Sequence, residues 1–232
     1  MSIEHIGIIM DGNRRWAKNK GLLSFQGHDN GASVFVDTCD WCIQENIKYL
    51  TVYAFSTENW NRSQEEVFHI FNLLERFFNE RLKQCLENDI KIKIIGNKSK
   101  FSKKTLAIIE NAEMQTRKCK KLSVQIALSY GGRDEIIRAV KKIAADVING
   151  KRTVKGITEK IFESYLDTSG VPDIDLVIRT GGNENRRLSN FLPWQTVYSE
   201  LYFSELMWPE FSRKEFNNAI KYYYSVVRKK GN

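Results

Sequence analysis

The chain has 232 residues, of which 42% are hydrophobic and 28% charged, and its 36 lysines and arginines outnumber its 28 aspartates and glutamates to give a net charge of +8. This composition suits one globular domain, predicted to span residues 1–232, with a substantial core. No stretch is long and apolar enough to span a bilayer, and the excess positive charge favours anionic partners: phosphorylated small molecules, nucleic acid or an acidic membrane surface.

The cysteines predict free thiols rather than a metal or redox site. Cys39 and Cys42 form a C-x-x-C pattern, but the pattern lies inside a helix-like run at 27–45, and no second Cys or His pair is spaced to complete a zinc site. Buried free thiols are typical of a reducing compartment, and the chain opens with a strand-like segment rather than a secretory leader. We therefore expect a cytoplasmic protein.

Short apolar runs alternate with stretches of helical periodicity along the chain. The helical stretches predict helices at 27–45, 63–87, 101–118, 133–148 and 212–232, and the apolar runs predict strands at 5–10, 49–55, 90–95, 122–128 and 174–178. This alternation predicts an α/β fold with a central, mainly parallel sheet covered by helices on both faces. Two of the strands, 90–95 and 122–128, alternate apolar with polar residues and are therefore expected near an edge of the sheet.

The first predicted strand ends in a polar cluster. Asp11 can hold a cation or a proton, the turn at Gly12 and Asn13 can direct backbone N–H groups at an anion, and Arg14 and Arg15 add positive charge. An isolated Asp at this position could instead cap the helix that follows. Because ligands of open α/β sheets bind where strands end and helices begin, the cluster predicts a site for a phosphate-bearing substrate.

A second polar cluster follows the strand at 49–55. Ser56, Thr57 and Glu58 suit turn or helix-capping roles. Trp60 and Arg62 have no evident local structural need in a loop, which favours a functional role for this segment.

A third cluster lies at 179–190, after the strand at 174–178. Arg179 stands at the strand end, where a guanidinium can bind a phosphate through two N–H groups, and Arg187 follows in the same loop. His28 opens a helix-like run, where a capping neighbour and a site residue are equally expected. Glu200 lies among apolar residues, where a carboxylate needs an arginine or a cation as a partner.

Taken together, these clusters and the Phe- and Leu-rich helix at 63–87 predict a diphosphate site beside an apolar slot. The chain contains no GxxxxGK[ST] or GxGxxG pattern, which excludes P-loop and dinucleotide-binding readings. It also contains no H-E-x-x-H or G-x-S-x-G pattern, which excludes the commonest hydrolase classes.

Seven segments resemble, in order and in register, the motifs of the cis-prenyltransferases, and most closely those of the bacterial undecaprenyl diphosphate synthases. The segments fall between residues 5 and 211 and read HIGIIMDGNRRWA, GH (27–28), YAFSTENWNR, SYGGRDEI, DLVIRTGG, RLSNFLPWQ and ELYFSELMWPEF. The resemblance implies a Mg²⁺-dependent transferase that condenses isopentenyl diphosphate units onto farnesyl diphosphate with cis stereochemistry. The implied product is undecaprenyl diphosphate, the lipid carrier for cell-wall glycan synthesis. The resemblance also implies an apolar tunnel inside the α/β domain, a homodimer, and peripheral contact with the inner membrane for product release.

The resemblance implies roles for individual residues as well. Asp11 would be the essential carboxylate that works with Mg²⁺, and Glu200 a metal-linked carboxylate acting across the dimer interface. Asn59 holds the position often assigned as proton acceptor, although an amide is a poor base. The other matched positions are implied to bind substrate: Gly12, Asn13, Arg14, Arg15, Trp16 and His28 at the allylic diphosphate; Ser56, Thr57, Glu58, Trp60 and Arg62 in a closing loop; and Arg179, Arg187, Leu188 and Ser189 at isopentenyl diphosphate.

The chain departs from the family pattern at two places. Ser24 stands where the family often has an arginine, so that Arg14 and Arg15 are expected to bind more of the diphosphate. The segment 183–186 is longer than its family counterpart, and Arg186 replaces a histidine that is sometimes close to the metal, which argues against a metal role there.

Two other functions fit parts of the sequence. A non-catalytic prenyltransferase-like partner subunit would keep the fold, but the chain retains Asp11, Asn13, Arg15, Arg179 and Arg187, which argues against it. A basic nucleic-acid-binding protein would explain the charge, but the lysines are scattered and no RNP or zinc-finger pattern occurs. A charged face that helps the protein dock on anionic lipid explains these lysines better.

Overall fold

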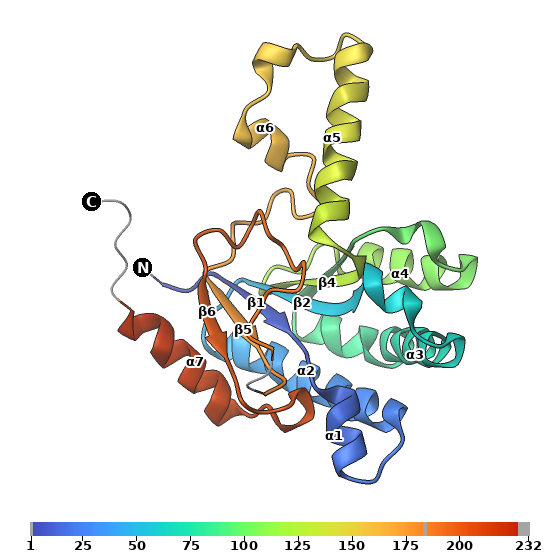
Figure 1. Ribbon diagram of the computed structural model, residues 1–232, viewed down its shortest axis with the longest axis vertical. Helices are drawn as coiled ribbons and strands as arrows, with labels where there is room; N and C mark the ends of the chain where they lie inside the picture. The colour runs from blue at the N-terminus through green and yellow to red at the C-terminus, as the bar shows by residue number, and fades with distance from the viewer. Residues whose placement is uncertain (1, 183–184, 227–232) are drawn as a thin grey trace.

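A six-stranded parallel sheet forms the centre of the protein (Figure 1). The structure is a computed structural model that describes residues 2–182 and 185–226. The strand order is β3-β4-β2-β1-β5-β6. The strands are β1 (His5–Ile9), β2 (Tyr49–Ser56), β3 (Ile90–Ile95), β4 (Leu122–Tyr130), β5 (Leu176–Arg179) and β6 (Glu200–Phe203). The α/β class and the parallel sheet expected from the sequence are confirmed.

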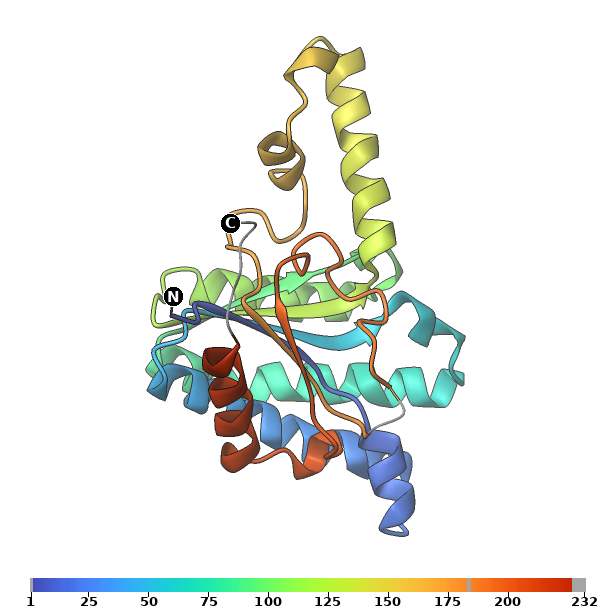
Figure 2. The same cartoon turned by 60° about the vertical axis from the view of Figure 1, so that its left-hand side comes forward.

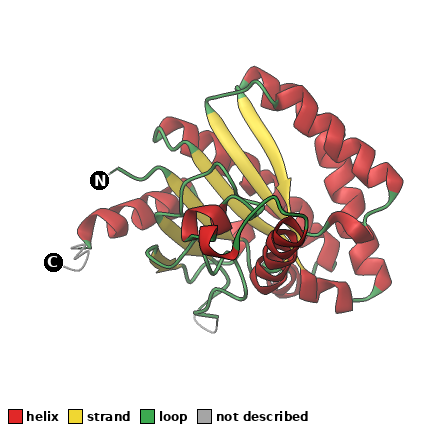
Figure 3. Ribbon diagram, turned by 90° about the horizontal axis from the view of Figure 1, so that it is seen from above, coloured by secondary structure: helices red, strands yellow, loops and turns green. Residues whose placement is uncertain are grey.

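Helices connect most of the successive strands along the chain. They are α1 (Asn13–Asn19), α2 (Ser24–Gln44), α3 (Gln64–Glu87), α4 (Lys103–Thr116), α5 (Gly132–Ile148), α6 (Glu159–Glu163) and α7 (Arg213–Ser225). Four short 3-10 helices complete the described elements: η1 (Thr57–Asn61), η2 (Lys98–Lys100), η3 (Val154–Gly156) and η4 (Trp208–Glu210). Viewed from above, the strands form a twisted fan with helices packed along it (Figure 3).

The two faces of the sheet are covered differently. One face carries the larger core, in which the buried side chains of β1, β2 and β4 pack against α2, α3, α4 and α7 through residues such as Cys42, Phe78, Ile109 and Phe216. The opposite face carries a smaller core, where Phe191 stacks on Tyr53 with 4.9 Å between ring centroids. Loop residues between β5 and β6 therefore cover much of this second face. The sequence predicted helices on both faces, which is wrong for this one.

Of the two strands predicted near an edge of the sheet, one is an edge strand and the other is not. β3 is an edge strand, with Lys91 exposed, as its alternating pattern predicted. The strand at 122–128 is not at an edge, because β4 lies between β3 and β2. Its polar residue Gln125 is fully buried, and its Oε1 accepts a hydrogen bond from Thr51 Oγ1 on β2 at 3.3 Å. Its buried Nε2 has no hydrogen-bond partner among the described residues, so the polar position is only half satisfied inside the sheet.

Several boundaries differ from the prediction. α2 begins at Ser24 rather than at 27, and α7 ends at Ser225, with Val227 of the predicted 212–232 helix outside the described residues. β6 and α6 were not predicted, since they have only four and five residues, too few to show a periodic pattern. The predicted free thiols are confirmed, with Cys39 and Cys42 buried.

An arm projects from the body of the protein (Figures 1 and 2). It consists of α5, η3 and α6, and the hydrogen bond from Arg152 Nε to Tyr165 Oη (2.7 Å) joins its two sides. At its base, Phe162 of α6 packs on Trp194 with 4.5 Å between ring centroids. No helix among the described residues is long and apolar enough to cross a membrane.

Candidate active site

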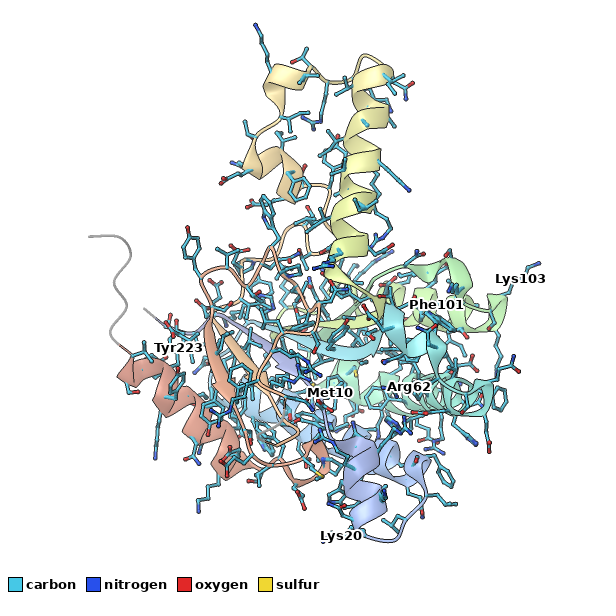
Figure 4. The ribbon with its side chains drawn as sticks, viewed as in Figure 1. Met10, Lys20, Arg62, Phe101, Lys103 and Tyr223 are labelled. Carbon is cyan, nitrogen blue, oxygen red and sulfur yellow. The ribbon has the colours of Figure 1, made fainter. Side chains whose placement is uncertain are left out.

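A cavity of about 1180 Å³ opens at the carboxyl ends of β1, β2 and β5 and runs between the sheet and helices α2 and α3. Met10, at the end of β1, and Arg62, after η1, both line it (Figure 4). The part of the cavity nearest the strand ends, here called the cavity mouth, is polar. The deeper part is apolar and is lined by side chains of β2, β4, α2 and α3, among them Phe35, Phe55, Ile70, Leu74, Phe77 and Ile126.

Asp11 lies at the cavity mouth and pairs with two arginines. Its Oδ2 accepts a hydrogen bond from Arg179 Nη2 at 2.8 Å, and its Oδ1 accepts one from Arg15 Nη2 at 3.3 Å. Gly12, not Asp11, is the N-cap of α1, so the alternative reading of Asp11 as a helix cap is wrong. The carboxylate is half-buried and lines the cavity.

Gly12 and Asn13 shape the turn between Asp11 and α1. Gly12 has φ 106°, and a Cβ there would lie 2.9 Å from Met207 Cβ, so the position requires glycine. Asn13 lines the cavity and donates from Nδ2 to the Met10 carbonyl at 3.1 Å. Its buried Oδ1 has no hydrogen-bond partner among residues 2–182 and 185–226.

Arg179 is held at the end of β5 with its side chain only 6% exposed. Besides Asp11, its guanidinium donates to Ser189 Oγ at 2.7 Å and to the Arg187 carbonyl. Its buried Nε has no hydrogen-bond partner in the described part of the chain. A buried guanidinium with spare donor capacity at a cavity wall favours an anionic ligand.

The loop after β2 forms another wall of the cavity mouth through Ser56, Glu58 and Asn59. Asn59 Oδ1 accepts a hydrogen bond from the Ser56 N–H at 3.0 Å, so this amide stabilises the start of η1. Burial raises the pKa of Glu58, but hydrogen bonds from its own backbone N–H, Ser56 and Asn190 outweigh burial and hold that pKa below its ordinary value. Glu58 is therefore a carboxylate at neutral pH.

Arg14, Arg62 and His28 line a further side of the cavity mouth and converge on Glu66 of α3. The Glu66 carboxylate is 2.8 Å from Arg62 Nη1, 3.4 Å from Arg14 Nη1 and 4.0 Å from His28 Nε2. Burial, and then the positive charge of Arg62, lower the pKa of His28 to about 4, so the imidazole is neutral at physiological pH. Ser24, which lines the cavity mouth near these groups, supplies no positive charge.

Some predicted site residues do not line the cavity. Trp60 packs against the core: its ring stacks on Phe71 (5.3 Å) and its Nε1 donates to Ser129 Oγ at 2.8 Å. The interpretation that Trp60 lacks a structural need is therefore wrong, because a core aromatic and a hydroxyl acceptor meet it from distant parts of the chain. Trp16, Thr57, Arg187 and Leu188 also stay outside the cavity lining, although Arg187 approaches it by donating from Nε to Ser189 Oγ at 3.4 Å.

Glu200 is not brought to Asp11 within one chain. It is the first residue of β6, paired in register with Leu176, whereas Asp11 lies beyond the far ends of the neighbouring strands. Glu200 lies three residue steps before Phe203, the last residue of β6, which places it roughly 10 Å back along the strand direction at about 3.3 Å per residue. Of the longer segment at 183–186, Asn183 and Glu184 lie outside the described residues, and Arg186 is exposed.

Two residues were missed from the sequence, one that lines the cavity mouth and one that lies directly behind it. Asn190 lines the cavity, donates from Nδ2 to Glu58 Oε1 at 3.1 Å, and accepts at Oδ1 from the Arg133 N–H at 2.9 Å, so it ties three loops together. Its place directly after Ser189 in a loop motif could have indicated it. Glu66 gave no such signal, because a glutamate in the first turn of a helix is an ordinary feature.

The cavity mouth fits a divalent cation held together with substrate phosphates. Within residues 2–182 and 185–226, no three His, Cys, Asp or Glu side chains cluster to hold a metal alone. Mg²⁺ is usually bound through one or two carboxylates plus substrate phosphates. Asp11 offers such a carboxylate beside Arg15 and Arg179, in a cavity that Arg14 and Arg62 also line. The predicted pair of Asp11 and Glu200 is not a metal site inside a single chain.

The comparisons with known proteins agree with this geometry. A prenyltransferase family model described as "Putative undecaprenyl diphosphate synthase" matches residues 9–231. The isoprenyl transferase of Aquifex pyrophilus is 44% identical over 98% of this chain and 95% of its own length. A tritrans,polycis-undecaprenyl-diphosphate synthase (geranylgeranyl-diphosphate specific) of Thermoplasma acidophilum is 43% identical over 98% of this chain and 88% of its own length.

Two solved structures share the fold. Lavandulyl diphosphate synthase from Lavandula x intermedia, solved with dimethylallyl diphosphate, has a TM-score of 0.95 and 34% identity, covering 100% of this chain and 99% of that one. A structure described as a "probable undecaprenyl diphosphate synthase" from Campylobacter jejuni has a TM-score of 0.82 and 36% identity, with both chains covered completely.

Proposed function

Because this chain belongs to the undecaprenyl diphosphate synthase family of cis-prenyltransferases, we propose that it condenses isopentenyl diphosphate units onto farnesyl diphosphate with cis stereochemistry. The product would be a long-chain polyprenyl diphosphate, undecaprenyl diphosphate, serving as the lipid carrier of cell-wall glycan synthesis. The observation that carries the proposal is a cationic cavity mouth that opens directly onto a deep apolar cavity of about 1180 Å³.

The residues of the cavity mouth divide the work on the two diphosphates. Arg14, Arg15 and the turn at Gly12 and Asn13 would bind the allylic diphosphate, and Arg179 with Ser189 would bind isopentenyl diphosphate. As the allylic bond ionises, negative charge grows on the leaving diphosphate, and guanidinium and backbone N–H donors already in place stabilise it. Mg²⁺, held by Asp11 and the phosphates, supplies further charge neutralisation when bound.

The carbon skeleton needs protection from water while the allylic cation exists. The apolar wall of the cavity excludes water beside the reacting carbons, and the loop containing Ser56, Glu58 and Asn59 is the wall that would close over them. The proton lost after attack would pass to a diphosphate oxygen, since Asn59 Oδ1 is already engaged by the Ser56 N–H and an amide is a poor base.

The size of the cavity favours a long product over a short one. The lavandulyl diphosphate synthase relative is named for a product much shorter than undecaprenyl diphosphate, and a short-chain prenyl transfer is the second candidate function. A cavity that continues past the diphosphate site to Phe35, Phe77 and Ile126 has room for a growing chain that a short product would not fill.

The proposal includes partners. A homodimer is supported by apolar residues left exposed on the arm, Ile137 and Val140 of α5. Peripheral contact with an acidic membrane for product release is supported by Leu22 and Leu23, which are exposed at the cavity mouth. The predicted cytoplasmic location stays a prediction.

Incubating the protein with labelled isopentenyl diphosphate and each of three primers would test the proposal. We expect chain elongation with farnesyl diphosphate, dependent on Mg²⁺ and abolished by a chelator, to products sized by chromatography. Elongation from geranylgeranyl diphosphate instead would change the primer, and a single condensation with dimethylallyl diphosphate would favour the short-chain function. No transfer with any primer would favour a non-catalytic subunit, and salt-sensitive binding of an oligonucleotide without transfer would favour the nucleic-acid-binding alternative.

A further inference from the structure

Glu66 is an acidic residue at the meeting point of three basic side chains. Its carboxylate contacts Arg62 through Oε1 (2.8 Å) and Arg14 through Oε2 (3.4 Å), and His28 Nε2 lies 4.0 Å from Oε1. The partners come from three separate parts of the chain: α1, α2 and the loop after η1. The Glu66 side chain is only 15% exposed, so these contacts are partly shielded from solvent.

The three partners line the cavity mouth, whereas Glu66 does not. The ion pairs therefore hold the two guanidinium groups beside α3, at a wall of the cavity mouth that both arginines line. His28 also remains incompletely satisfied, because its buried Nε2 has no hydrogen-bond partner among the described residues. An anion entering the cavity would meet the same three groups and would compete with Glu66 for their N–H donors.

Glu66 also occupies a position that favours negative charge in its own right. It lies in the first turn of α3, where Ser63 is the N-cap and its Oγ accepts from the Glu66 N–H at 3.3 Å. Free N–H groups and the helix dipole at such an end attract an anion. The carboxylate is thus stabilised by the start of α3 while it holds two guanidinium groups that a phosphate at the cavity mouth would also attract.

We propose that the Glu66 carboxylate is a built-in competitor of the substrate diphosphate: it holds Arg14 and Arg62 while the cavity mouth is empty and releases them when a diphosphate binds. The inference rests on the proposed function, which makes a diphosphate the ligand of these arginines. The protein should therefore bind a diphosphate more weakly than the number of basic groups at the cavity mouth suggests, because binding must first break the ion pairs of Glu66 with Arg14 and Arg62. Such a contact keeps the arginines ordered and eases release of the diphosphate product.

A positioning role for Glu66 predicts the opposite change in diphosphate affinity when its charge is removed. If Glu66 only positioned Arg62 for substrate, removing its charge would free the guanidinium and weaken diphosphate binding. If Glu66 competes with the ligand, removing its charge raises the positive charge of the cavity mouth and strengthens binding. The substitution Glu66→Gln keeps the size of the side chain and a possible hydrogen bond to Arg62, so it isolates the charge.

The matched control is one residue away. Glu65 lies on the same turn of α3, but its side chain is 86% exposed and pairs with His69 at 3.8 Å. Glu65→Gln changes the net charge of the protein by the same amount without touching the cavity mouth. Any effect of overall charge on anion binding appears equally in both variants.

The test is the dissociation constant of inorganic pyrophosphate, measured by titration calorimetry in chelator-treated buffer on the full chain. We expect Glu66→Gln to bind pyrophosphate about fivefold more tightly than the unsubstituted protein, the scale of one partly shielded ion pair, and Glu65→Gln to bind it unchanged. Replacing Arg14 by alanine in the Glu66→Gln protein should remove most of the gain, because the gain depends on a freed guanidinium. Thermal melting of each variant checks that it is folded.

Two outcomes overturn the inference in distinguishable ways. Equal or weaker binding by folded Glu66→Gln, with clear binding by the unsubstituted protein, leaves the diphosphate site in place and shows that Glu66 is not a competitor. Equal gains in Glu65→Gln and Glu66→Gln reduce the effect to net charge and also overturn it. Absence of pyrophosphate binding in every protein removes the diphosphate site itself, and the proposed function falls together with the inference.

Discussion

At the scale of single residues, the cavity mouth carries more positive charge than it neutralises internally. Arg179 is nearly fully buried, and Asp11, its one carboxylate partner in the described structure, is shared with Arg15. Arg179 Nε and Asn13 Oδ1 are buried polar atoms without hydrogen-bond partners among residues 2–182 and 185–226. Because unsatisfied buried polar groups destabilise a fold, their concentration at one cavity indicates that a ligand completes these interactions.

Asp11→Asn should lower prenyl transfer at least about 1,000-fold, because it removes the carboxylate expected to work with Mg²⁺ while keeping the size of the side chain. The loss of one ion pair with a buried arginine should also cost about 1–3 kcal/mol of unfolding free energy. Steady-state turnover and urea unfolding would measure the two effects. Asp37→Asn, at an exposed position of α2, is the control and should change neither. Turnover within tenfold of normal in Asp11→Asn would remove Asp11 from the catalytic site.

His5 should make the fold sensitive to acid. Burial lowers its pKa from 6.5 to about 4, while its ring contacts the Pro172 carbonyl (2.7 Å) and Thr51 Oγ1 (2.8 Å). The folded pKa is below the unfolded one, so stability is complete above pH 6.5 and falls as the pH drops toward 4, when the unfolded chain binds the proton first. Between pH 7 and pH 5 this group alone should remove about 2 kcal/mol.

The pH dependence of urea unfolding for the normal protein and His5→Asn checks this expectation. The variant is less stable at pH 7, but it should lose about 2 kcal/mol less between pH 7 and pH 5. His28 titrates with the same sign in both proteins, so its contribution cancels in the comparison. Parallel pH profiles for the two proteins would show that His5 does not carry the effect.

At the scale of elements, the sequence predicted what local pattern determines. The apolar stripe of α3 and the polar residues at the ends of β1, β2 and β5 follow from periodicity and from strand-end position, and both were predicted correctly. Contacts between distant segments left no such pattern. The sequence predicted a functional role for Trp60, but its indole contacts Ser129 and Phe71 in the core. It placed Gln125 near an edge of the sheet, but Thr51 of the neighbouring strand β2 donates a hydrogen bond to it. Strand order, loop coverage and Glu66 depend on the same long-range packing.

The apolar cavity ends where α2, α3 and β4 meet. Phe35, Phe77 and Ile126 line both the large cavity and a second cavity of about 30 Å³ behind it, and the rings of Phe35 and Phe77 are 5.6 Å apart. These three residues are here called the tunnel floor. Because they separate two apolar spaces, the tunnel floor is expected to stop the growing chain.

Phe77→Ala should therefore lengthen the products by at least one isoprene unit, at a cost of about 3 kcal/mol in stability. Reaction with farnesyl and labelled isopentenyl diphosphates, followed by chromatographic sizing, measures the shift. Phe68→Ala removes the same side chain from the same helix at a position that is 64% exposed, and it should leave product length unchanged. Unchanged length in a folded Phe77→Ala protein would place the end of the tunnel elsewhere.

At the scale of the whole molecule, the arm is the feature that the core of the fold does not need. It extends α5 and α6 away from the sheet (Figure 2), and α5 leaves Ile137 and Val140 exposed on one side. The neighbouring segment exposes Val197 and Tyr198, next to Glu200. Apolar side chains exposed together on a projecting element are typical of a subunit interface, which is the role proposed for this face.

The double substitution Ile137→Glu with Val140→Glu should convert a dimer to a monomer, since each would place a charge in the interface. Sedimentation velocity at micromolar concentration measures the state directly. Met114→Glu, at an exposed apolar position of α4, is the matched control and should stay dimeric. A monomer before any substitution, or a dimer that survives the double substitution, would show that the arm is not the interface.

Mixed dimers would test the expected role of Glu200 across the interface. Within one chain Glu200 lies at the wrong end of β6 to reach Asp11, so an acidic partner at the metal would have to come from the second subunit. Asp11→Asn and Glu200→Gln should each inactivate a homodimer. When the two variants are co-expressed with different tags and the mixed dimer is purified, one of its two sites combines a normal Asp11 with a normal Glu200 from the other chain.

That mixed dimer should recover up to about half of the normal turnover, because a site assembled from two chains needs only one good residue from each. If Glu200 acted within its own chain, both sites of the mixed dimer would carry one defect and turnover would stay at the level of the inactive homodimers. A fully active Glu200→Gln homodimer would show instead that the carboxylate has no part in catalysis. The mixed dimer separates these outcomes because Glu200 begins β6 whereas Asp11 follows the end of β1, so the length of β6 lies between the two carboxylates within one chain.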